Sequence, residues 1–403
     1  MNYSIDDVLQ YVKEEDVKFI RIAFCDVFGT PKNISIMPHE LERVFEYGVS
    51  IDASAIKGFG GDIYSDLLLH PEPGTLMWLP WRPEQGKVVR MFSGITYPDG
   101  RPFECDTRSL LKKAVEEAGQ YGYEFTFGSE QEFYLLKLDD SGNPTGIPYD
   151  NAGYMDIAPL DKCENIRREI CLTLEQMGIM PESSHHEEGP GQCEVDFRYG
   201  EPLEAADNTV TFQSVVRTVA GRNGLCADFS PKPLKGFPGN GFHINVSLRS
   251  GMNDVLRDRM IGGLMKNVPA MTVFLNPCED SYKRFGSDKA PSKISWSREN
   301  RSQFIRVPAA AYPYMRIELR SPDPLANPYL AFALVIYACL DGLLSKLSPG
   351  EPADINLFSA PEDILAKYGS LPSSIAEAAA VSKNDAFIRK HLSDEIIAIY
   401  CDV

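Results

Sequence analysis

The sequence predicts an α+β fold of two domains, and three observations support this prediction. The chain has 403 residues, which exceeds the usual size of a single hydrophobic core. Segments that alternate between apolar and polar residues, as strands do, are mixed along the chain with segments of helical periodicity. A turn-rich connector, YPDGRPFECDTR at residues 97–108, follows the first group of elements. We therefore predict two domains, residues 1–101 and 102–403.

The first domain is predicted to begin with a helix and a pair of strands. Ser4 stands before two aspartates, which is a typical helix start, and apolar residues then recur with helical spacing up to Val12. Residues 17–37 predict two strands joined by a turn at Gly29. These local signals place the strands of the first domain early in the chain.

Three further segments predict helices in the second domain. Residues 106–122 begin with a capping aspartate and end at Gly122, which favours a helix terminus. Residues 327–347 form a long apolar helix that we expect in the core, because its length and Asp341 argue against a membrane span. Residues 373–392 have the pattern of an amphipathic helical region.

Five segments of the second domain predict strands with one apolar face and one face of ligand atoms. Strand side chains point to opposite faces with a period of two, so alternate residues share a face. Carboxylates, a histidine and arginines on such faces are typical of a metal and phosphate site, whereas a solvated face more often carries Lys, Thr and Ser. The segments are residues 124–138, 184–197, 239–248, 300–307 and 315–330.

Two pairs of acids are the first candidates for metal ligands. Glu130 and Glu132 share a strand face, and phenylalanines on the other face favour a buried sheet over a solvated edge strand. Burying both acids without a cation would be costly. Glu187 and Glu194 flank the turn at residues 189–191, and a hairpin there would bring the two carboxylates together.

Three histidines can be compared as candidate metal ligands. His185 and His186 are neighbours, and neighbours on a strand face opposite ways, so both cannot easily bind one ion. His243 is the better candidate because its face also carries Asn245 and Ser247. A lone histidine is more often a core residue, and only the acids elsewhere make His243 a ligand candidate.

The residue types favour divalent metal ions and a nucleotide. Mg²⁺ and Mn²⁺ prefer carboxylates and tolerate an imidazole, and this set is large enough for two or more ions, which would neutralise nucleotide phosphates. The candidate ligands are Glu130, Glu132, Glu187, Glu194, His243 and Glu318. Arginines would stabilise the transferred phosphate or hold a substrate carboxylate. The candidates are Arg301, Arg306 and Arg316 for phosphate, and Arg284 and Arg320 for carboxylate.

Composition excludes several classes of function. The formal net charge of -17 argues against a nucleic-acid or anionic-membrane partner. The nine cysteines have no paired spacing, which is typical of reduced thiols. The N-terminus lacks an apolar signal core, and no P-loop motif is present. We therefore expect a cytoplasmic enzyme whose nucleotide site is not of the common type.

Taken together, the motifs resemble those of the bacterial-type glutamine synthetase family across nearly the whole chain. In that family ATP phosphorylates the γ-carboxylate of L-glutamate, and ammonia then displaces the phosphate. The resemblance implies a small β-grasp N-terminal domain and a larger catalytic domain, an antiparallel curved sheet flanked by helices. It also implies a homo-oligomer, a six-membered ring with active sites between subunits. The motifs are FCDVFGTPKNISI, IDASAIKGF, SEQEF, SHHEEGPGQCE, GNGFHINVSL, NRSQFIRVP and RIELRSPDPLANPYLAFAL.

The resemblance assigns roles to individual residues. Two metal ions, Mg²⁺ or Mn²⁺, would be held by Glu132, Glu187 and Glu194, and by Glu130, His243 and Glu318. The residues that bind glutamate and ammonium would be Tyr154, Gly239, Arg284 and Arg320. The ATP-binding residues would be Tyr199, Ser247, Arg301, Arg306 and Arg316. The catalytic residues would be Asp52 of the neighbouring subunit, which takes a proton from ammonium, Glu187 and Arg301.

Four departures from the family pattern bear on these implications. A DGSS motif is replaced by residues 52–55, DASA, and the position of an adenylylated tyrosine is Phe358. The family's flap glutamate is replaced by Lys289, with Asp288 before it. The chain ends before the tail that joins two rings in the family. We therefore expect hexamers or a dodecamer that dissociates on dilution.

Two alternatives to a glutamate–ammonia ligase remain at this point. The altered flap favours a γ-glutamyl ligase whose acceptor is a larger amine, such as a polyamine or ethanolamine. Asp52, Tyr154 and Glu187 favour ammonia. A ring-forming structural relative without activity would have broken metal ligands, and none of the ligand residues is broken here.

Overall fold

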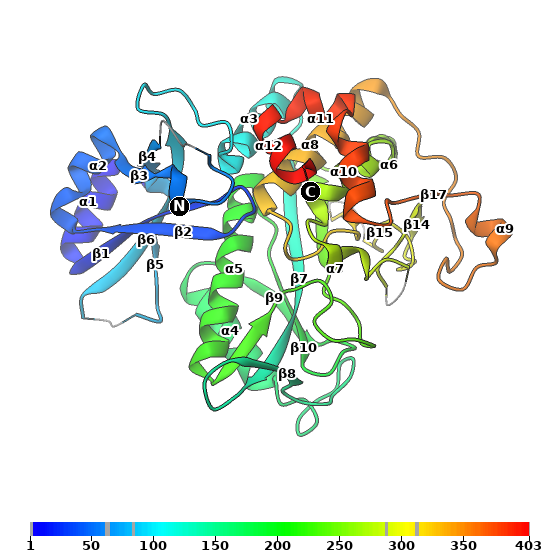
Figure 1. Cartoon of the computed structure of the whole chain (residues 1–403), viewed down its shortest axis with the longest axis horizontal. Helices are drawn as coiled ribbons and strands as arrows, with labels where there is room; N and C mark the ends of the chain where they lie inside the picture. Colours follow the sequence, from blue (N-terminus) through cyan, green and yellow to red (C-terminus); the bar gives the residue numbers. More distant parts are fainter. Residues whose placement is uncertain (1–2, 61–64, 83–84, 287–288, 311–313, 403) are drawn as a thin grey trace.

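The computed structural model describes residues 3–60, 65–82, 85–286, 289–310 and 314–402. An N-terminal sheet with two helices lies beside a larger part built on a second sheet (Figure 1). The elements of the first part are α1 (Ile5–Glu14), β1 (Val17–Cys25), β2 (Pro31–Ile36), α2 (Leu41–Tyr47), β3 (Val49–Asp52), β4 (Asp66–Pro71), β5 (Met77–Trp78) and β6 (Lys87–Thr96), with 3-10 turns at Pro38–Glu40, Ala53–Ala55 and Pro73–Thr75.

The first part follows the predicted order of a helix and two strands. Ser4 caps α1 by accepting a hydrogen bond from the backbone of Asp7, whose carboxylate bonds back to Ser4. The sheet has the strand order β2-β1-β6-β4-β3, with β5 paired to β6. The central pair, β1 and β6, is parallel, and the other pairs are antiparallel. The strand β3 at one edge of this sheet ends at Asp52.

The second part is a mixed arrangement of strands and helices around β7. Its elements are α3 (Thr107–Gln120), β7 (Phe125–Leu138), β8 (Pro144–Pro148), α4 (Glu164–Gln176), β9 (Pro181–His186), β10 (Gln192–Phe197), α5 (Pro202–Arg222), β11 (Leu225–Asp228), β12 (Phe242–Leu248), α6 (Asp254–Leu275), α7 (Glu279–Tyr282), β13 (Lys293–Ile294), β14 (Trp296–Arg298), β15 (Ile305–Val307), β16 (Ile317–Leu319), α8 (Pro328–Ser345), α9 (Glu362–Leu365), β17 (Gly369–Ser370), α10 (Ile375–Lys383), α11 (Ala386–His391) and α12 (Asp394–Cys401).

The sheet of the second part has the order β14-β15-β16-β12-β7-β10-β9, and β8 and β11 also pair with β7. The pairs that β7 makes are all antiparallel. The strand β7 runs over 14 residues, and Phe127 and Phe133, on the face opposite Glu130 and Glu132, are fully buried. Its length lets one strand carry residues that meet β12 on one side and β10 on the other.

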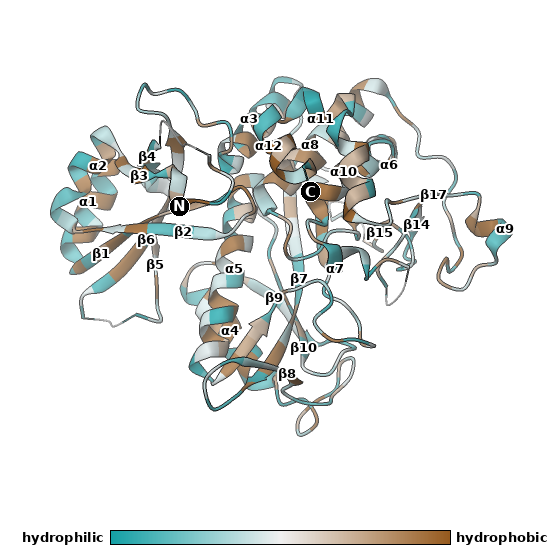
Figure 2. Cartoon of the chain, in the orientation of Figure 1, coloured by the Kyte–Doolittle hydropathy of each residue, from teal (hydrophilic) through white to brown (hydrophobic). Residues whose placement is uncertain are grey.

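The helices predicted for the second domain are present. Residues 373–392 form two helices rather than one region, because Asp385 caps a new helix, α11, after α10 has ended. Among the described residues, α8 alone is long and apolar enough to cross a membrane, so its length does not argue against a span. Instead 83% of that segment is buried inside the protein, as in a core helix. Figure 2 shows the hydrophobic residues of α8 and α12 together, with hydrophilic residues on α11.

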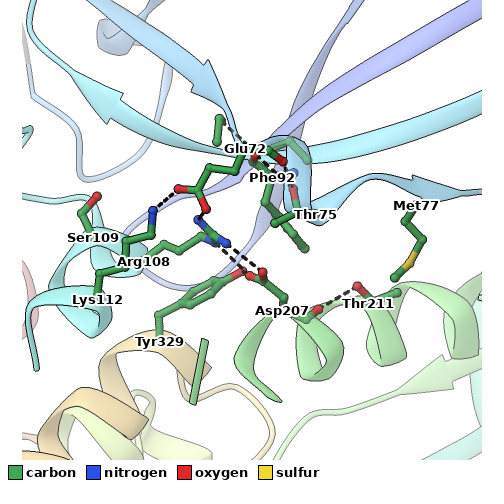
Figure 3. Close-up of polar contacts among 12 residues, drawn as sticks. Glu72, Thr75, Met77, Phe92, Arg108, Ser109, Lys112, Asp207, Thr211 and Tyr329 are labelled. Carbon is green, nitrogen blue, oxygen red and sulfur yellow. Dashed lines mark hydrogen bonds and ion pairs between the residues drawn. The ribbon is translucent and has the colours of Figure 1, made fainter. Parts of the chain in front are cut away.

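A buried ionic junction joins the two parts (Figure 3). Arg108 of α3 donates two hydrogen bonds to Asp207 of α5, both at 2.9 Å, and its guanidinium lies 2.8 Å from Glu72, which follows β4. Tyr329 of α8 donates a hydrogen bond to Asp207 at 2.7 Å. Because Arg108 and Asp207 are charged and buried, each needs its partner, and the pair of Arg108 with the half-buried Glu72 fixes one part against the other.

Candidate active site

One group of metal-ligand candidates comes from three neighbouring strands. His243 of β12 lies opposite Glu130 of β7, and Asn245 lies opposite Glu318 of β16. His243 Nδ1 is 3.2 Å from a Glu130 carboxylate oxygen and 3.7 Å from a Glu318 oxygen. Asn245 donates a hydrogen bond to Glu130 at 2.7 Å. Antiparallel register therefore brings together the two acids and the imidazole that the family resemblance implies as one set of ligands.

A second group forms where the hairpin of β9 and β10 meets β7. Glu194 of β10 lies opposite both Glu132 of β7 and His185 of β9. His185 is 3.6 Å from a Glu187 oxygen through Nδ1 and 3.5 Å from a Glu194 oxygen through Nε2. The backbone of Gly241 donates a hydrogen bond to Glu132 at 2.8 Å, which holds that carboxylate in place. The turn after β9 thus brings Glu187 and Glu194 together, as predicted.

The acids of this second group repel one another. Burial and the charge of Glu132 raise the pKa of Glu187 to about 8. Burial, with the charges of Asp196 and the neighbouring glutamates, raises the pKa of Glu194 well above its usual range. Burial and Glu130 raise the pKa of Asp196 to about 7. Since burial also lowers the pKa of His185, that imidazole does not supply the missing positive charge.

Glu318, in the first group, is balanced by cations. Burial alone would raise its pKa, but Arg320, His243 and Arg306 outweigh that effect and hold the pKa of Glu318 at about 2. Arg306 donates a hydrogen bond to Glu318 at 2.6 Å, and Arg320 makes a short ion pair with the other carboxylate oxygen. Glu318 is therefore ionised at any ordinary pH and is available as an anionic ligand.

A pocket opens beside the second group and contains the residues predicted to bind glutamate. A Cβ on Gly239 would lie 2.4 Å from the carbonyl of Pro231 and 2.8 Å from Arg284, so only glycine fits this approach. Arg284 is almost fully buried and donates to the carbonyls of Asn240 and Ser321 at 2.7 and 2.6 Å. The lining residues are Glu132, Glu187, Glu188, Gln192, Pro238, Gly239, Gly241, His243, Arg284, Lys289, Ala290 and Arg320.

Lys289 lines this pocket, and Tyr154 lies between Lys289 and the second group. The Tyr154 ring packs edge-on against His185, with 5.5 Å between centroids. Lys289 Nζ is 4.9 Å from the centroid of the Tyr154 ring and 2.6 Å from a Glu188 oxygen. Asp288, the other flap residue singled out from the sequence, lies outside the described residues.

The residues predicted to bind ATP lie on or near the strands of the first group, and not all of them contact it. Arg316 donates a hydrogen bond to Asn245 at 3.1 Å, and Ser247 donates to the carbonyl of Met315 at 2.6 Å. The ring of Tyr199 lies against Gly128 of β7, where a Cβ would be 3.1 Å from it. Arg301 is exposed in the loop before β15, and no described ion pair joins it to either acidic group.

Asp52 is exposed at the end of β3 in the N-terminal part. It accepts hydrogen bonds from the backbone and hydroxyl of Ser54 at 2.9 and 2.6 Å, and these bonds lower its pKa. Within the described part of the chain, no hydrogen bond or ion pair joins it to the acidic groups. The structure thus brings the metal-ligand candidates together within one chain but does not bring Asp52 to them.

Sequence reasoning missed two features of the site. His185 was set aside but faces Glu187 and Glu194, and Asp196 joins Glu130 and Glu194 in a further group of carboxylates. The spacing of Asp196, two residues after Glu194 on one strand, was a signal that could have found it. His186 faces the opposite way, as predicted, and pairs with the buried Asp150 at 3.0 Å.

The donor atoms fit divalent metal ions of the hard type. Glu130, His243 and Glu318 of the first group have ligand atoms within 4.8 Å of one another, and so do His185, Glu187 and Glu194 of the second group. A further set, Glu132 and Glu194 with His243, joins the two groups within the same distance. Carboxylates with an occasional imidazole are the ligands that Mg²⁺ and Mn²⁺ accept. The excess of acids in the second group is itself an argument for a cation there.

Comparison with known families accounts for both parts of the chain. Residues 16–98 match the family described as "Glutamine synthetase, beta-Grasp domain", and residues 104–403 match "Glutamine synthetase, catalytic domain". The chain belongs to the glutamine synthetase family. The predicted α+β fold, with a β-grasp N-terminal domain and a catalytic domain, is therefore confirmed.

Individual relatives are similar over nearly their whole length. A protein named Glutamine synthetase from Methanosarcina mazei is 44% identical over 98% of this chain and 92% of that protein. The one from Clostridium saccharobutylicum is 41% identical over 99% and 93%. Among solved structures, "GmaS/ADP complex-Conformation 1" has a TM-score of 0.88 at 27% identity, covering 98% of this chain and 94% of the other. "Apo GmaS without ligand" has the same TM-score at 28% identity and the same coverage.

Proposed function

We propose that the chain is a glutamate–ammonia ligase, which joins ammonia to the γ-carboxylate of L-glutamate through a γ-glutamyl phosphate formed from ATP. The observation that carries this proposal is the pair of acidic groups that meet at His243, beside a pocket lined by Gly239 and Arg320. Acids alone at this density are destabilising, so the site needs cations and a substrate to complete it. Family membership implies ATP and a divalent metal ion.

The residues of the two groups would bind two separate metal ions. Glu132, Glu187 and Glu194 would hold one ion, and Glu130, His243 and Glu318 would hold another. When bound, Mg²⁺ or Mn²⁺ would neutralise the nucleotide phosphates and the transferred phosphoryl group. The arginines Arg301, Arg306 and Arg316 would stabilise the phosphate charge, and Tyr199 and Ser247 would line the nucleotide site. Arg284, Arg320 and the backbone of Gly239 would orient glutamate.

The acceptor is proposed to be ammonium, bound near Tyr154 and Glu187. Asp52 would take its proton, but within the described residues Asp52 contacts only its own domain. A neighbouring subunit would therefore supply Asp52, which requires a homo-oligomer, and a closed ring is the natural result of such a head-to-tail contact. We also infer a cytoplasmic protein with domains 1–101 and 102–403.

A larger amine as acceptor is the second candidate. The loss of the flap glutamate that the family uses favours it, because the position that would close on ammonium is Lys289 here. The likeness to the GmaS structures, at 27% and 28% identity, keeps this candidate open but is weaker than the 40–44% identity to proteins named Glutamine synthetase.

A coupled phosphate-release assay tests the proposal. The enzyme is supplied with ATP, L-glutamate, Mg²⁺ or Mn²⁺ and a panel of amines that runs from ammonium through ethanolamine to a polyamine. We expect the highest kcat/KM with ammonium, and glutamine as the product by mass spectrometry. A bulky amine with the higher kcat/KM would favour the second candidate. No phosphate release with any amine would contradict both.

A further inference from the structure

The ammonium group of Lys289 is held between a carboxylate and an aromatic ring. Its Nζ lies 2.6 Å from Glu188 and 4.9 Å from the centroid of the Tyr154 ring, and the lysine lines the pocket together with Glu187. An anion on one side and a π face on the other are the contacts with which proteins bind free alkylammonium ions. Lys289 therefore makes, from within the chain, the contacts expected of an amine ligand.

The backbone holds Lys289 at this place. Its φ is 65°, a left-handed conformation that is uncommon for lysine and that a structure keeps only where the surroundings require it. The carbonyl of Lys289 accepts a hydrogen bond from the buried Arg320 at 3.5 Å, and the backbone of Gly286 bonds the carbonyl of Ala290 at 2.9 Å. The anchored backbone leaves the long side chain as the part that can move.

We propose that Lys289 is a specificity-determining residue whose tethered ammonium group occupies the acceptor end of the pocket and competes there with positively charged amines. This inference rests on the proposed function, because it takes the end beside Tyr154 and Glu187 as the place where the acceptor binds. An amine that arrives as a cation must displace Lys289 from Glu188. An amine that arrives neutral does not meet the same charge repulsion.

The solvent exposure of the Lys289–Glu188 ion pair determines how strongly Lys289 competes with a cationic acceptor. The side chains of Lys289 and Glu188 are 38% and 40% exposed, so their ion pair is partly screened by water. Such a pair is weak enough for a substrate to displace, yet a tethered group competes at a high effective concentration. We expect Lys289 to raise the KM for cationic acceptors by a factor of about three to five.

The experiment compares Lys289→Gln with wild-type enzyme using ammonium, a dicationic diamine such as putrescine, and hydroxylamine, which is largely neutral near pH 7. The KM for ammonium should fall about threefold to fivefold, that for the diamine by at least as much, and that for hydroxylamine by less than twofold. Lys289→Arg, which keeps the charge, should retain the wild-type values. Lys293→Gln is the matched control, because Lys293 bonds Ser370 and does not line this pocket.

The outcomes separate this inference from the proposed function. Glutamine formation by the wild type, with equal KM changes for charged and neutral acceptors in Lys289→Gln, would overturn the role of Lys289 and leave the ligase intact. Failure of the wild type to form glutamine would contradict the proposed function and this inference with it. Lys289→Met is a second uncharged variant, and a thermal melt of each protein confirms that the fold is retained.

Discussion

The interdomain junction and the acidic pocket both bury carboxylates, but they differ in how the charges are balanced. At the junction, Glu72 and Asp207 face Arg108, and Lys112 makes a further ion pair with Glu72 (Figure 3). At the acidic pocket, Glu187 and Glu194 lie against His185, whose pKa is lowered by burial. The junction is thus complete within the chain, whereas the pocket is completed only by something that binds to it.

The difference separates residues that stabilise the fold from residues that serve the reaction. Breaking a buried ion pair leaves an uncompensated charge and destabilises a protein strongly. Removing one acid from a crowded group of acids relieves repulsion instead. The same type of substitution, an acid changed to its amide, should therefore have opposite effects in the two regions.

The largest effect is expected from Glu132→Gln in the pocket. Loss of one proposed metal ligand and of its charge should reduce kcat/KM by about 1,000-fold or more, which corresponds to roughly 4 kcal/mol. The free energy of unfolding of the metal-free protein should stay the same or rise, because repulsion with Glu187 is relieved. Steady-state assays and urea unfolding measure the two quantities. A variant that keeps wild-type activity would remove Glu132 from the site.

Asp207→Asn at the junction should do the reverse. The change leaves Arg108 buried beside an amide and weakens the hydrogen bond from Tyr329, so we expect a loss of about 3 kcal/mol in the free energy of unfolding. Asp280→Asn is the matched control, because Asp280 makes an exposed pair with Lys283 and should cost less than about 1 kcal/mol. Equal losses in the two variants would show that the junction is not a stabilising unit.

A smaller effect is expected from a change of pH on the stability of the metal-free protein, and the sign of this effect differs between Glu187 and Glu318. The pKa of Glu187 is raised from 4.5 to about 8, so the folded state retains a proton that the unfolded state loses. Stability of the metal-free protein should therefore fall as pH rises from about 5 to about 8. The pKa of Glu318 is lowered to about 2, so its contribution is present above about pH 4.5 and is lost only in acid.

Urea unfolding of the metal-free protein in a chelator between pH 5 and pH 8.5 measures this prediction. A divalent metal ion should remove the fall in stability, since it favours the ionised acids. Glu187→Gln should flatten the same part of the profile without metal. A metal-free profile that rises over this range would contradict the proposed repulsion.

The parts of the site that the sequence could predict are those set by a single strand or turn. Glu130 and Glu132 share a face because side chains alternate along β7, and the turn at residues 189–191 places Glu187 near Glu194. These relations are local, so the order of residues is sufficient to predict them. The period of two also predicted correctly that His185 and His186 face opposite ways.

The parts that were missed depend on contacts between distant segments. His185 belongs to the site because β10 lies between β9 and β7 in the sheet. The alternation of residues along β9 does not predict which strands lie beside it. Asp150 and His186 pair across 36 positions of sequence, and Arg108 and Asp207 across 99. Such pairs depend on how the elements pack, which neither periodicity nor composition specifies.

Isothermal titration of the metal-free protein with Mn²⁺ tests most directly the claim that cations complete the acidic pocket. We predict at least two ions per chain, with proton release on binding at pH 7, because Glu187 and Glu194 are held partly protonated without metal. Glu132→Gln should lose one ion, and Asp207→Asn should lose none. Wild-type protein that binds no Mn²⁺, or binds it without releasing protons, would contradict the account.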